Sequence, residues 1–239
     1  HLLLPPSLSW RGMNLQAWDN PLNFCEDMWP QKMWAAQEQL IQRAWKEKRL
    51  AVKAGHGVGK SYALARLALS FLVSHPGSKV LTTAPTWTQV EKILWAEMRA
   101  ALHAMRVRPA GTLLNTELRC GENWFALGIS TDEVERLQGF HAPHVLVIFD
   151  EASGIPAPLW EAAESLLVAE GSHWVAVGNP LEAAGPFYQC FQSGSPWATM
   201  TISCEESPNV VAGKELIPGL VSRAWVEQKR EEWGKTPRS

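Results

Sequence analysis

A lysine and a serine within a glycine-rich stretch, KAGHGVGKSYALA (residues 53–65), are the side chains best placed for chemistry. Glycines at alternate positions let successive backbone N–H groups curl around phosphate oxygens. Lys60 would then reach the β and γ phosphates, and the Ser61 hydroxyl would ligate Mg²⁺ at the positive N-terminus of the next helix. The alternative is a glycine-rich turn that contains Lys-Ser by coincidence. The predicted phosphate loop comprises Gly55, His56, Gly57, Val58, Gly59, Lys60 and Ser61.

Two adjacent carboxylates, Asp150 and Glu151, end the apolar run VLVIFDE at residues 145–151. At the carboxyl tip of a buried strand, Asp150 can hold Mg²⁺ through water, while Glu151 can polarise the water that attacks a γ phosphate. Taken alone, such a pair is also typical of a solvated strand end. We therefore predict that the cradle around Lys60 and this acidic tip converge on one complex of magnesium and a triphosphate.

A third polar residue, Asn179, follows the apolar run in WVAVGNP (residues 174–180). Ligands of open α/β sheets gather at the carboxyl ends of the strands, so this side chain is expected near the nucleotide, where it could sense the γ phosphate. An ordinary Asn-Pro turn is the other interpretation of the same residues.

The elements that must position these residues alternate between short apolar strands and amphipathic helices. Strands are predicted at 49–54, 79–83, 145–149 and 174–177, a hairpin at 112–129, and helices at 31–48, 61–74, 87–105, 159–169 and 221–233. Strands that are apolar on both faces and alternate with helices indicate an α/β fold with a mainly parallel central sheet flanked by helices.

Composition limits the classes of protein that this chain can represent. Its 239 residues, 46% hydrophobic and 19% charged, indicate a globular fold rather than a disordered one. A net charge of −2 provides no general basic field for nucleic acid. The four cysteines lack C-x-x-C spacing, which argues against a zinc site or a disulfide framework. The longest apolar run, 63–73, is shorter than the roughly 20 residues of a membrane span, so no membrane contact is predicted.

The ordered set GHGVGKS, TTAPTWTQV, LQGFHAPHVLVIFDEASG and VAVGNP resembles the ATPase domain of the large terminase subunit of tailed bacteriophages. The resemblance covers roughly residues 25–235. It implies a P-loop NTPase of the additional-strand, catalytic-glutamate class that uses ATP and Mg²⁺. Carried over position by position, it implies a Walker A lysine and hydroxyl at Lys60 and Ser61, a Walker B aspartate and catalytic glutamate at Asp150 and Glu151, and a coupling-motif residue at Asn179.

The same resemblance suggests two further residues. Gln31 looks like the glutamine that reads the adenine edge, with a polar residue at a helix N-terminus as the alternative. Some family members carry an arginine within the Walker A loop, whereas this chain has His56 there. An arginine finger from a neighbouring subunit is therefore expected, and Arg136 is the candidate, with a solvated arginine as the alternative. Arg106 and Arg108 are the reserves.

For the whole protein, the resemblance implies ATP-driven translocation of double-stranded viral DNA into a procapsid. The implied partners are duplex DNA, the portal protein and the small terminase subunit. A homo-oligomeric ring is implied on the procapsid, with a monomer as the alternative for an isolated fragment. The implied location is the host bacterial cytoplasm and, transiently, the portal vertex. A helicase-like translocase and a non-hydrolysing nucleotide-binding scaffold are the competing functions.

The chain is expected to divide into three parts. Residues 1–30 form an irregular N-terminal arm, residues 31–203 the P-loop ATPase core, and residues 204–239 a linker or lid extension. That extension would lead toward a C-terminal nuclease domain that this chain lacks, so nuclease activity is not expected here.

Overall fold

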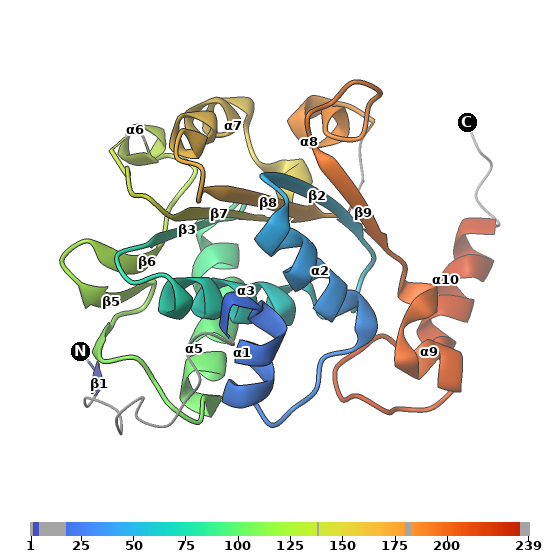
Figure 1. Ribbon diagram of the computed structural model, residues 1–239. Helices are drawn as coiled ribbons and strands as arrows, with labels where there is room; N and C mark the ends of the chain where they lie inside the picture. The colour runs from blue at the N-terminus through green and yellow to red at the C-terminus, as the bar shows by residue number, and fades with distance from the viewer. Residues whose placement is uncertain (1, 5–17, 138, 180–182, 235–239) are drawn as a thin grey trace.

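A central β-sheet with helices on both faces forms the body of the computed structural model (Figure 1). The structure describes residues 2–4, 18–137, 139–179 and 183–234. Within them the sheet has the strand order β1-β4-β5-β6-β3-β7-β8-β2-β9. The strands are β1 (Leu2–Leu4), β2 (Arg49–Ala54), β3 (Lys79–Thr83), β4 (Gly111–Leu113), β5 (Glu117–Gly121), β6 (Trp124–Gly128), β7 (Val145–Asp150), β8 (His173–Gly178) and β9 (Ala198–Ile202).

The pairing of these strands confirms the predicted mainly parallel sheet. Every neighbouring pair from β6 to β9 is parallel, whereas β1, β4, β5 and β6 pair antiparallel. The registers align Asp150 of β7 with Val177 of β8, and Gly178 of β8 with Lys53 of β2. The carboxyl ends of these three central strands therefore lie side by side along one edge of the sheet.

Side-chain alternation along the strands builds a core on each face of the sheet. On β7, Leu146 and Ile148 pack into one apolar cluster, while Val147 and Phe149 pack into the other. The first cluster also contains side chains from the helices below the sheet in Figure 1, and the second from those above it. Because a parallel strand is buried on both faces, the run VLVIF is apolar throughout.

The helices follow the predicted pattern with shifted ends. They are α1 (Pro21–Met28), α2 (Ala35–Lys46), α3 (Lys60–Ser74), α4 (Trp87–Gln89), α5 (Trp95–Ala104), α6 (Val134–Leu137), α7 (Ala157–Glu164), α8 (Gly185–Gln189), α9 (Pro208–Ala212) and α10 (Arg223–Gly234). Single turns of other helix types lie at Val90–Leu94, Ala152–Gly154, Ser165–Leu167 and Cys204–Glu206. None of the described helices is long and apolar enough to cross a membrane.

Four expectations about these elements were wrong in detail. The predicted irregular arm, residues 1–30, contains the helix α1, which begins at a Pro preceded by the capping side chain of Asn20. The helix predicted at 31–48 begins only at Ala35. A π-helical turn, Val90–Leu94, interrupts the helix predicted at 87–105. The helix predicted at 159–169 already ends as an α-helix at Glu164 and continues as a 3₁₀ turn.

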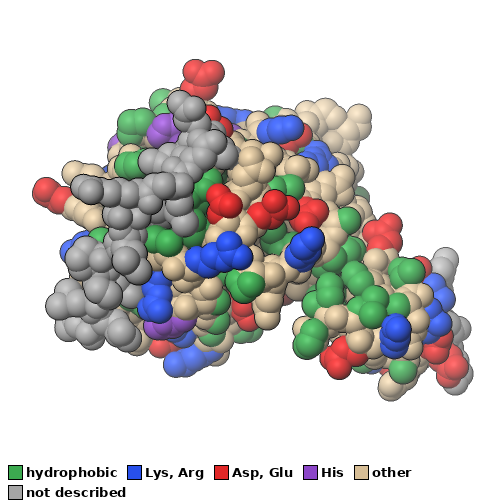
Figure 2. Space-filling view, turned by 60° about the horizontal axis from the view of Figure 1, so that its bottom comes forward, with side chains coloured by type: hydrophobic (Ala, Val, Ile, Leu, Met, Phe, Trp, Pro, Cys, Tyr) green, Lys and Arg blue, Asp and Glu red, His purple; other side chains and the backbone are tan. Residues whose placement is uncertain are grey.

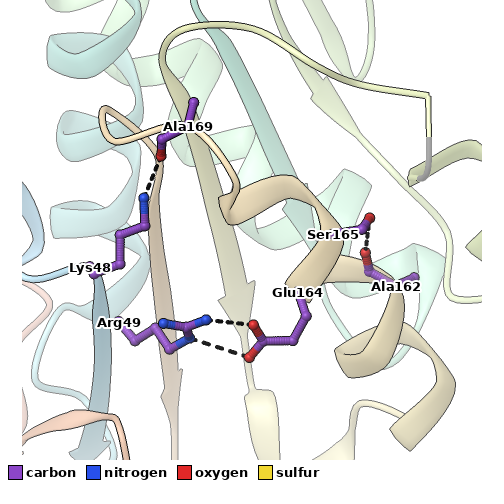
Figure 3. A network of polar contacts seen from close by, with 6 residues as sticks. All are labelled: Lys48, Arg49, Ala162, Glu164, Ser165 and Ala169. Atoms are coloured by element: carbon purple, nitrogen blue, oxygen red, sulfur yellow. Dashed lines mark hydrogen bonds and ion pairs between the residues drawn. The ribbon is translucent and has the colours of Figure 1, made fainter.

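The amino end of β2 is fastened to the segment that follows α7 (Figure 3). Arg49 and Glu164 form an ion pair of 2.6 Å, and the Lys48 ammonium donates to the carbonyl of Ala169. The Ser165 hydroxyl donates to the Ala162 carbonyl at 2.7 Å. The contacts of Lys48 and Arg49 hold the end of β2 that is remote from the phosphate loop.

The last part of the chain packs beside the sheet edge formed by β9 (Figure 1). Residues 203–222, with α9, connect β9 to α10. In Figure 2 the extension after β9 stands as a lobe beside the body of the molecule. Hydrophobic side chains gather on this lobe where it faces the body.

Candidate active site

The predicted phosphate loop joins β2 to the N-terminus of α3, as the sequence predicted. Gly57 and Gly59 have φ of 63° and 76°, a left-handed backbone that favours glycine. Gly59 is the N-cap of α3, so the helix begins at Lys60. A Cβ at Gly59 would collide with the Gln37 amide nitrogen, and the Gly55 N–H donates to the Ile202 carbonyl at 3.0 Å. The glycines therefore serve both loop curvature and close packing.

The structure brings the loop and the acidic tip of β7 together. The Ser61 Oγ donates to the Asp150 Oδ2 at 3.3 Å, and the Lys60 Nζ lies 2.9 Å from the Glu151 Oε1. These two contacts join residues that are about ninety positions apart in the sequence. The structure thus brings Lys60 and Ser61 beside Glu151 and Asp150, and their shared binding of magnesium and a triphosphate stays a prediction.

Asp150 and Glu151 occupy different environments although they are neighbours. Asp150 is only 3% exposed. Burial, together with the charge of Glu151, raises the pKa of the Asp150 carboxyl to about 6, while Lys60 and the hydrogen bonds from the Glu151 N–H and Ser61 oppose that rise. Glu151 is half-exposed, and its N–H donates to the Asp150 Oδ1 at 3.0 Å. One carboxylate is thus a fixed buried acceptor, and the other can meet solvent.

Glu151 also has an unusual backbone. Its φ of 49° and ψ of 46° are left-handed, and it is the only non-glycine residue with positive φ within the described part of the chain. Such a conformation costs an L-residue with a Cβ roughly 1–2 kcal/mol. Strain of this kind concentrates at functional sites, because the surrounding structure holds a side chain in a required direction.

Asn179 lies on the same edge of the sheet, next to the phosphate loop. Its Nδ2 is 2.8 Å from the Nε2 of His56. The imidazole of His56 also meets the edge of the Trp225 ring on α10, at a centroid distance of 6.0 Å. His56 therefore links the loop to the residue after β8 and to α10 of the extension. The sequence did not indicate this linking role.

Gln31 lies near the loop but is exposed, and the Tyr62 hydroxyl approaches its Oε1 at 3.5 Å. The glutamine in direct contact with the loop is Gln37, which the sequence analysis missed. The buried Gln37 amide donates to the Gly59 carbonyl at 3.1 Å and accepts from the Trp34 N–H at 3.2 Å. A glutamine three positions after a helix N-cap is the signal that could have identified it.

A cavity of about 710 Å³ opens beside the loop. The loop residues 57–61, both glutamines Gln31 and Gln37, and the extension residues 216–220 contribute to its walls. Its volume falls within the roughly 300–1,000 Å³ of small-molecule sites.

The three candidate arginine fingers lie on or after helices outside the phosphate loop. Arg136 lies on the short helix α6, before the strand that carries Asp150, and its side chain is outside the described part of the structure. Arg106 and Arg108 follow α5; the Arg106 N–H donates to the Met28 carbonyl at 2.9 Å, and Arg108 lies 3.5 Å from His103. Their predicted role as a finger for a neighbouring copy stays a prediction.

The donor set at the loop fits a magnesium ion. A hydroxyl and a buried carboxylate, 3.3 Å apart, offer the oxygen ligands that Mg²⁺ prefers, and nucleotide phosphates and water usually complete its shell. Among the described residues, no group of three or more His, Cys, Asp or Glu side chains could hold a metal ion. A metal held by Ser61 and Asp150 together with phosphate oxygens does not require such a group.

Comparison with known proteins gives one consistent result. No family model matches the chain. A curated relative, "Probable terminase, large subunit" of Enterobacteria phage P7, is 24% identical over 213 residues. This alignment covers 77% of the chain and 39% of that relative, so the chain spans well under half of the relative's length.

Solved structures of the same kind share the fold. A point variant of the large terminase ATPase domain of Thermus phage P74-26 has a TM-score of 0.61 at 22% identity, covering 88% of this chain and 89% of that one. The large terminase of a thermophilic bacteriophage, solved in complex with ADP, has a TM-score of 0.59 at 13% identity, covering 83% of this chain and 50% of that one. The resemblance found in the sequence is thus confirmed, and the chain has the fold of the ATPase domain of phage large terminases.

Proposed function

We propose that this chain hydrolyses ATP with Mg²⁺ and that the reaction drives duplex DNA into a phage procapsid. The observation that carries the first part is the meeting of Lys60 with Glu151 and of Ser61 with Asp150 at one edge of the sheet. ADP bound to the large terminase of a thermophilic phage supports a nucleotide as the ligand of this fold.

The residues of the site have separate roles in binding phosphates, metal and water. The loop N–H groups and Lys60 bind the phosphates, and Ser61 and Asp150 hold the metal. When bound, Mg²⁺ neutralises charge on the phosphate oxygens. In the structure, Lys60 pairs with Glu151 at 2.9 Å. A triphosphate draws Lys60 toward its own oxygens, and Glu151 is then free to accept a proton from the attacking water.

Two further observations support the proposed class of P-loop NTPase and the proposed coupling of hydrolysis to movement. Strand β8 lies between β2, which leads into the loop, and β7, which ends in the carboxylates. This inserted strand supports the additional-strand, catalytic-glutamate class. Asn179 follows that strand and contacts His56 of the phosphate loop at 2.8 Å, which supports a role in sensing the loss of a γ phosphate.

The part of the proposal that concerns DNA rests on the likeness to terminases. Residues 31–203 would form the ATPase core and residues 204–239 an extension, with the portal protein, the small terminase subunit and duplex DNA as partners. Because the net charge is −2, DNA contact requires a local basic patch or a further part of the protein. We propose the host cytoplasm and the portal vertex as the places of action.

Replacement of the proposed base tests hydrolysis. Glu151→Gln keeps the size and hydrogen-bonding reach of the side chain but removes its ability to accept a proton. We expect phosphate release to fall at least about 100-fold, the usual scale of general-base catalysis, while ATP binding is retained. Colourimetric phosphate release and calorimetric ATP titration measure the two properties. Equal turnover in both proteins would reject Glu151 as the base, and a wild-type chain that binds ATP without turnover even under ring-forming conditions would be a scaffold.

The same assay tests the proposed ring. If Arg136 acts on a neighbouring copy, Arg136→Ala and Glu151→Gln are each inactive, but a mixture regains activity where an intact Glu151 faces an intact Arg136. Random mixing in a head-to-tail ring predicts roughly one quarter of wild-type turnover under ring-forming conditions. No recovery in the mixture would exclude Arg136 as a finger acting between subunits.

A further inference from the structure

A second cavity, of about 350 Å³, opens among the helices that lie below the sheet in Figure 1. Its walls come from α1, the segment that joins α1 to α2, the helices α2 and α3, and Arg106 after α5. None of its described lining residues belongs to the phosphate loop 55–61, and it shares Gln31 and Lys32 with the cavity beside that loop. What this second cavity binds is therefore a separate question from nucleotide binding.

Arg66 of α3 borders the second cavity and is only 4% exposed. Its Nη1 donates to the Tyr62 carbonyl at 3.0 Å, but its buried Nε meets no acceptor among the described residues. Arg66 also takes part in none of the ion pairs found among these residues. A guanidinium offers five N–H donors and stays positively charged in proteins. Most of the hydrogen-bonding capacity of this buried cation is therefore unused.

Two aromatic rings stabilise the Arg66 charge only in part. The guanidinium lies 3.1 Å from the centroid of the Tyr62 ring and 5.4 Å from that of the Trp29 ring. Ring faces attract a cation but do not replace an anionic partner. Burial lowers the pKa of Arg66, because the charge is kept away from water. Since buried charges in proteins are normally paired, the cavity beside Arg66 is a suitable place for an anion.

Four more charged side chains border the cavity without pairing with one another. Arg106 and Lys32 are exposed cations, while Glu38 is half-buried and Glu26 is exposed. Within the described part of the chain, none of the four forms an ion pair. Together with Arg66, the walls carry three cations and two carboxylates. The cavity thus favours an anion that can also satisfy a carboxylate.

The Cys25 thiol, which borders the cavity, shows that charges of both signs act on one region of the wall. Burial raises the pKa of Cys25 to about 12; the charge of Arg66 opposes that rise, and the charges of Glu26 and Glu38 add to it. The buried cation and the two carboxylates therefore lie around the same part of the cavity.

We propose that this cavity binds hydrogen phosphate, with Arg66 as the buried anchor, Arg106 and Lys32 as cations at the rim, and Glu38 as the acceptor of its proton. The planar fork of a guanidinium matches two oxygens of a phosphate. Hydrogen phosphate also carries one O–H donor, which a carboxylate accepts. Because Arg66 is almost fully buried, a small free ion reaches it more easily than a phosphate of a polymer. This inference does not rest on the proposed function.

Titration with inorganic phosphate tests the site in a chain whose phosphate loop is disabled. Lys60→Ala removes the cation of the loop, so that phosphate bound there does not obscure the second cavity. Arg66→Met and Arg106→Ala are then added singly to this parent. Arg108→Ala is the matched control, because Arg108 also follows α5 and does not border the cavity. Calorimetry at a pH of about 8, where phosphate keeps one proton, gives the dissociation constants.

We expect the Lys60→Ala parent to bind phosphate and Arg66→Met to weaken that binding at least about tenfold, because a charged hydrogen-bonding partner is lost. Arg106→Ala should weaken it about two- to fivefold, since an exposed charge contributes less, and Arg108→Ala should match the parent. A parent that binds no phosphate would overturn the inference, as would unchanged affinity in both Arg66→Met and Arg106→Ala. Arg106 is exposed, so its variant keeps the test decisive if Arg66→Met does not fold.

Sulfate tests the role assigned to Glu38, because it has the shape of phosphate but carries no proton at this pH. A site that hydrogen-bonds an O–H group rejects an analogue without it, so sulfate should bind the parent at least about tenfold more weakly than phosphate. Glu38→Gln offers an N–H donor to sulfate and should narrow this ratio, whereas Glu26→Gln should leave it unchanged. Equal affinity of the parent for the two ions would contradict the assignment of hydrogen phosphate. A ratio that changes in Glu26→Gln but not in Glu38→Gln would contradict the role of Glu38.

Discussion

At the scale of single residues, the proposed base Glu151 has a backbone conformation that is unfavourable for a residue with a Cβ. It is held in a left-handed backbone conformation, with φ of 49°, and its carboxylate pairs with Lys60 at 2.9 Å. Asp150, one position earlier, ends the regular strand and is buried. The left-handed backbone thus coincides with a carboxylate that contacts the phosphate loop. The two acids can therefore do different work although they are adjacent.

This strain predicts a measurable difference in stability between two variants that both lose function. Glu151→Ala and Glu151→Gly both lose the carboxylate and its ion pair, but only glycine accepts the left-handed backbone without a steric cost. After the larger unfolded-state entropy of glycine is subtracted, Glu151→Gly should be about 0.5–1 kcal/mol more stable than Glu151→Ala. Urea denaturation of the two variants measures this difference, and both should fail to release phosphate. Equal or lower stability of the glycine variant would show that the backbone at residue 151 is not strained.

The sequence predicted the contact residues better than their conformations. Lys60, Ser61, Asp150 and Asn179 were predicted because their residue types follow apolar strands at the point where ligands bind. The contact of Gln37 with Gly59 was missed, because the helix start at residue 35 and the path of the loop decide it. The left-handed Glu151 was equally hidden, since nothing in the letters DEASG demands positive φ.

At the scale of elements, the phosphate loop of the sheet packs against both the helix α2 and the extension after β9. Gly55 approaches Cys204, Gly57 approaches Val221, and Gly59 approaches Gln37 and Leu220. The glycines therefore allow the helix α2 and the extension to reach the loop backbone. A side chain at these positions would disturb both phosphate binding and packing.

Glycine substitutions separate crowding from backbone conformation. Gly59 and Gly77 both have positive φ, 76° and 82°, but a Cβ meets Gln37 and Leu220 at the first and no atom within 4 Å at the second. Gly77→Ala should lower the free energy of unfolding by about 1 kcal/mol, and Gly59→Ala by a further 1–3 kcal/mol or so, because its Cβ also overpacks.

Chemical denaturation checks these values, and ATP titration adds a second measurement. Gly59→Ala should lose ATP binding because the Gln37 amide must leave the Gly59 carbonyl, whereas Gly77→Ala should bind ATP like the wild type. If both variants unfold at the same denaturant concentration, close packing at the loop is not what selects glycine there.

The elements that the sequence predicted best are the short central strands of the sheet. Strands 49–54, 79–83 and 145–149 were predicted within a residue of β2, β3 and β7, because each has a short, mainly apolar centre. The strand β9 was not predicted, although ATMTI alternates apolar and polar residues, because it is short and its pairing with β2 is a long-range contact. The π-helical turn at Val90–Leu94 inserts one extra residue per turn, which no helical period reveals.

At the scale of the whole molecule, the sheet order decides whether the motifs can act together. The P-loop strand β2, the strand β8 that precedes Asn179 and the strand β7 with its two carboxylates are consecutive neighbours and parallel. Parallel neighbours place their carboxyl ends together, so three motifs that are far apart in the chain share one edge. The spacing of motifs along the sequence suggested this arrangement, and only the strand order establishes it.

The extension was the part of the molecule that the sequence described least. Residues 204–220 lack a clear period, and the whole extension was expected to lead toward a further domain. Instead, Trp225 meets His56, and Val221 bonds to Gly57. Both contacts join residues that are far apart in the chain, and they depend on the path of the backbone between β9 and α10, which the sequence did not reveal.

A crystal structure of the chain with Mg²⁺ and a non-hydrolysable ATP analogue tests the central claim most directly. The account predicts the metal between the Ser61 hydroxyl and the Asp150 carboxylate, the Lys60 ammonium moved from Glu151 to the phosphates, and the γ phosphate facing Glu151. A nucleotide bound away from residues 55–61, or a metal without Ser61 and Asp150 around it, would contradict the account.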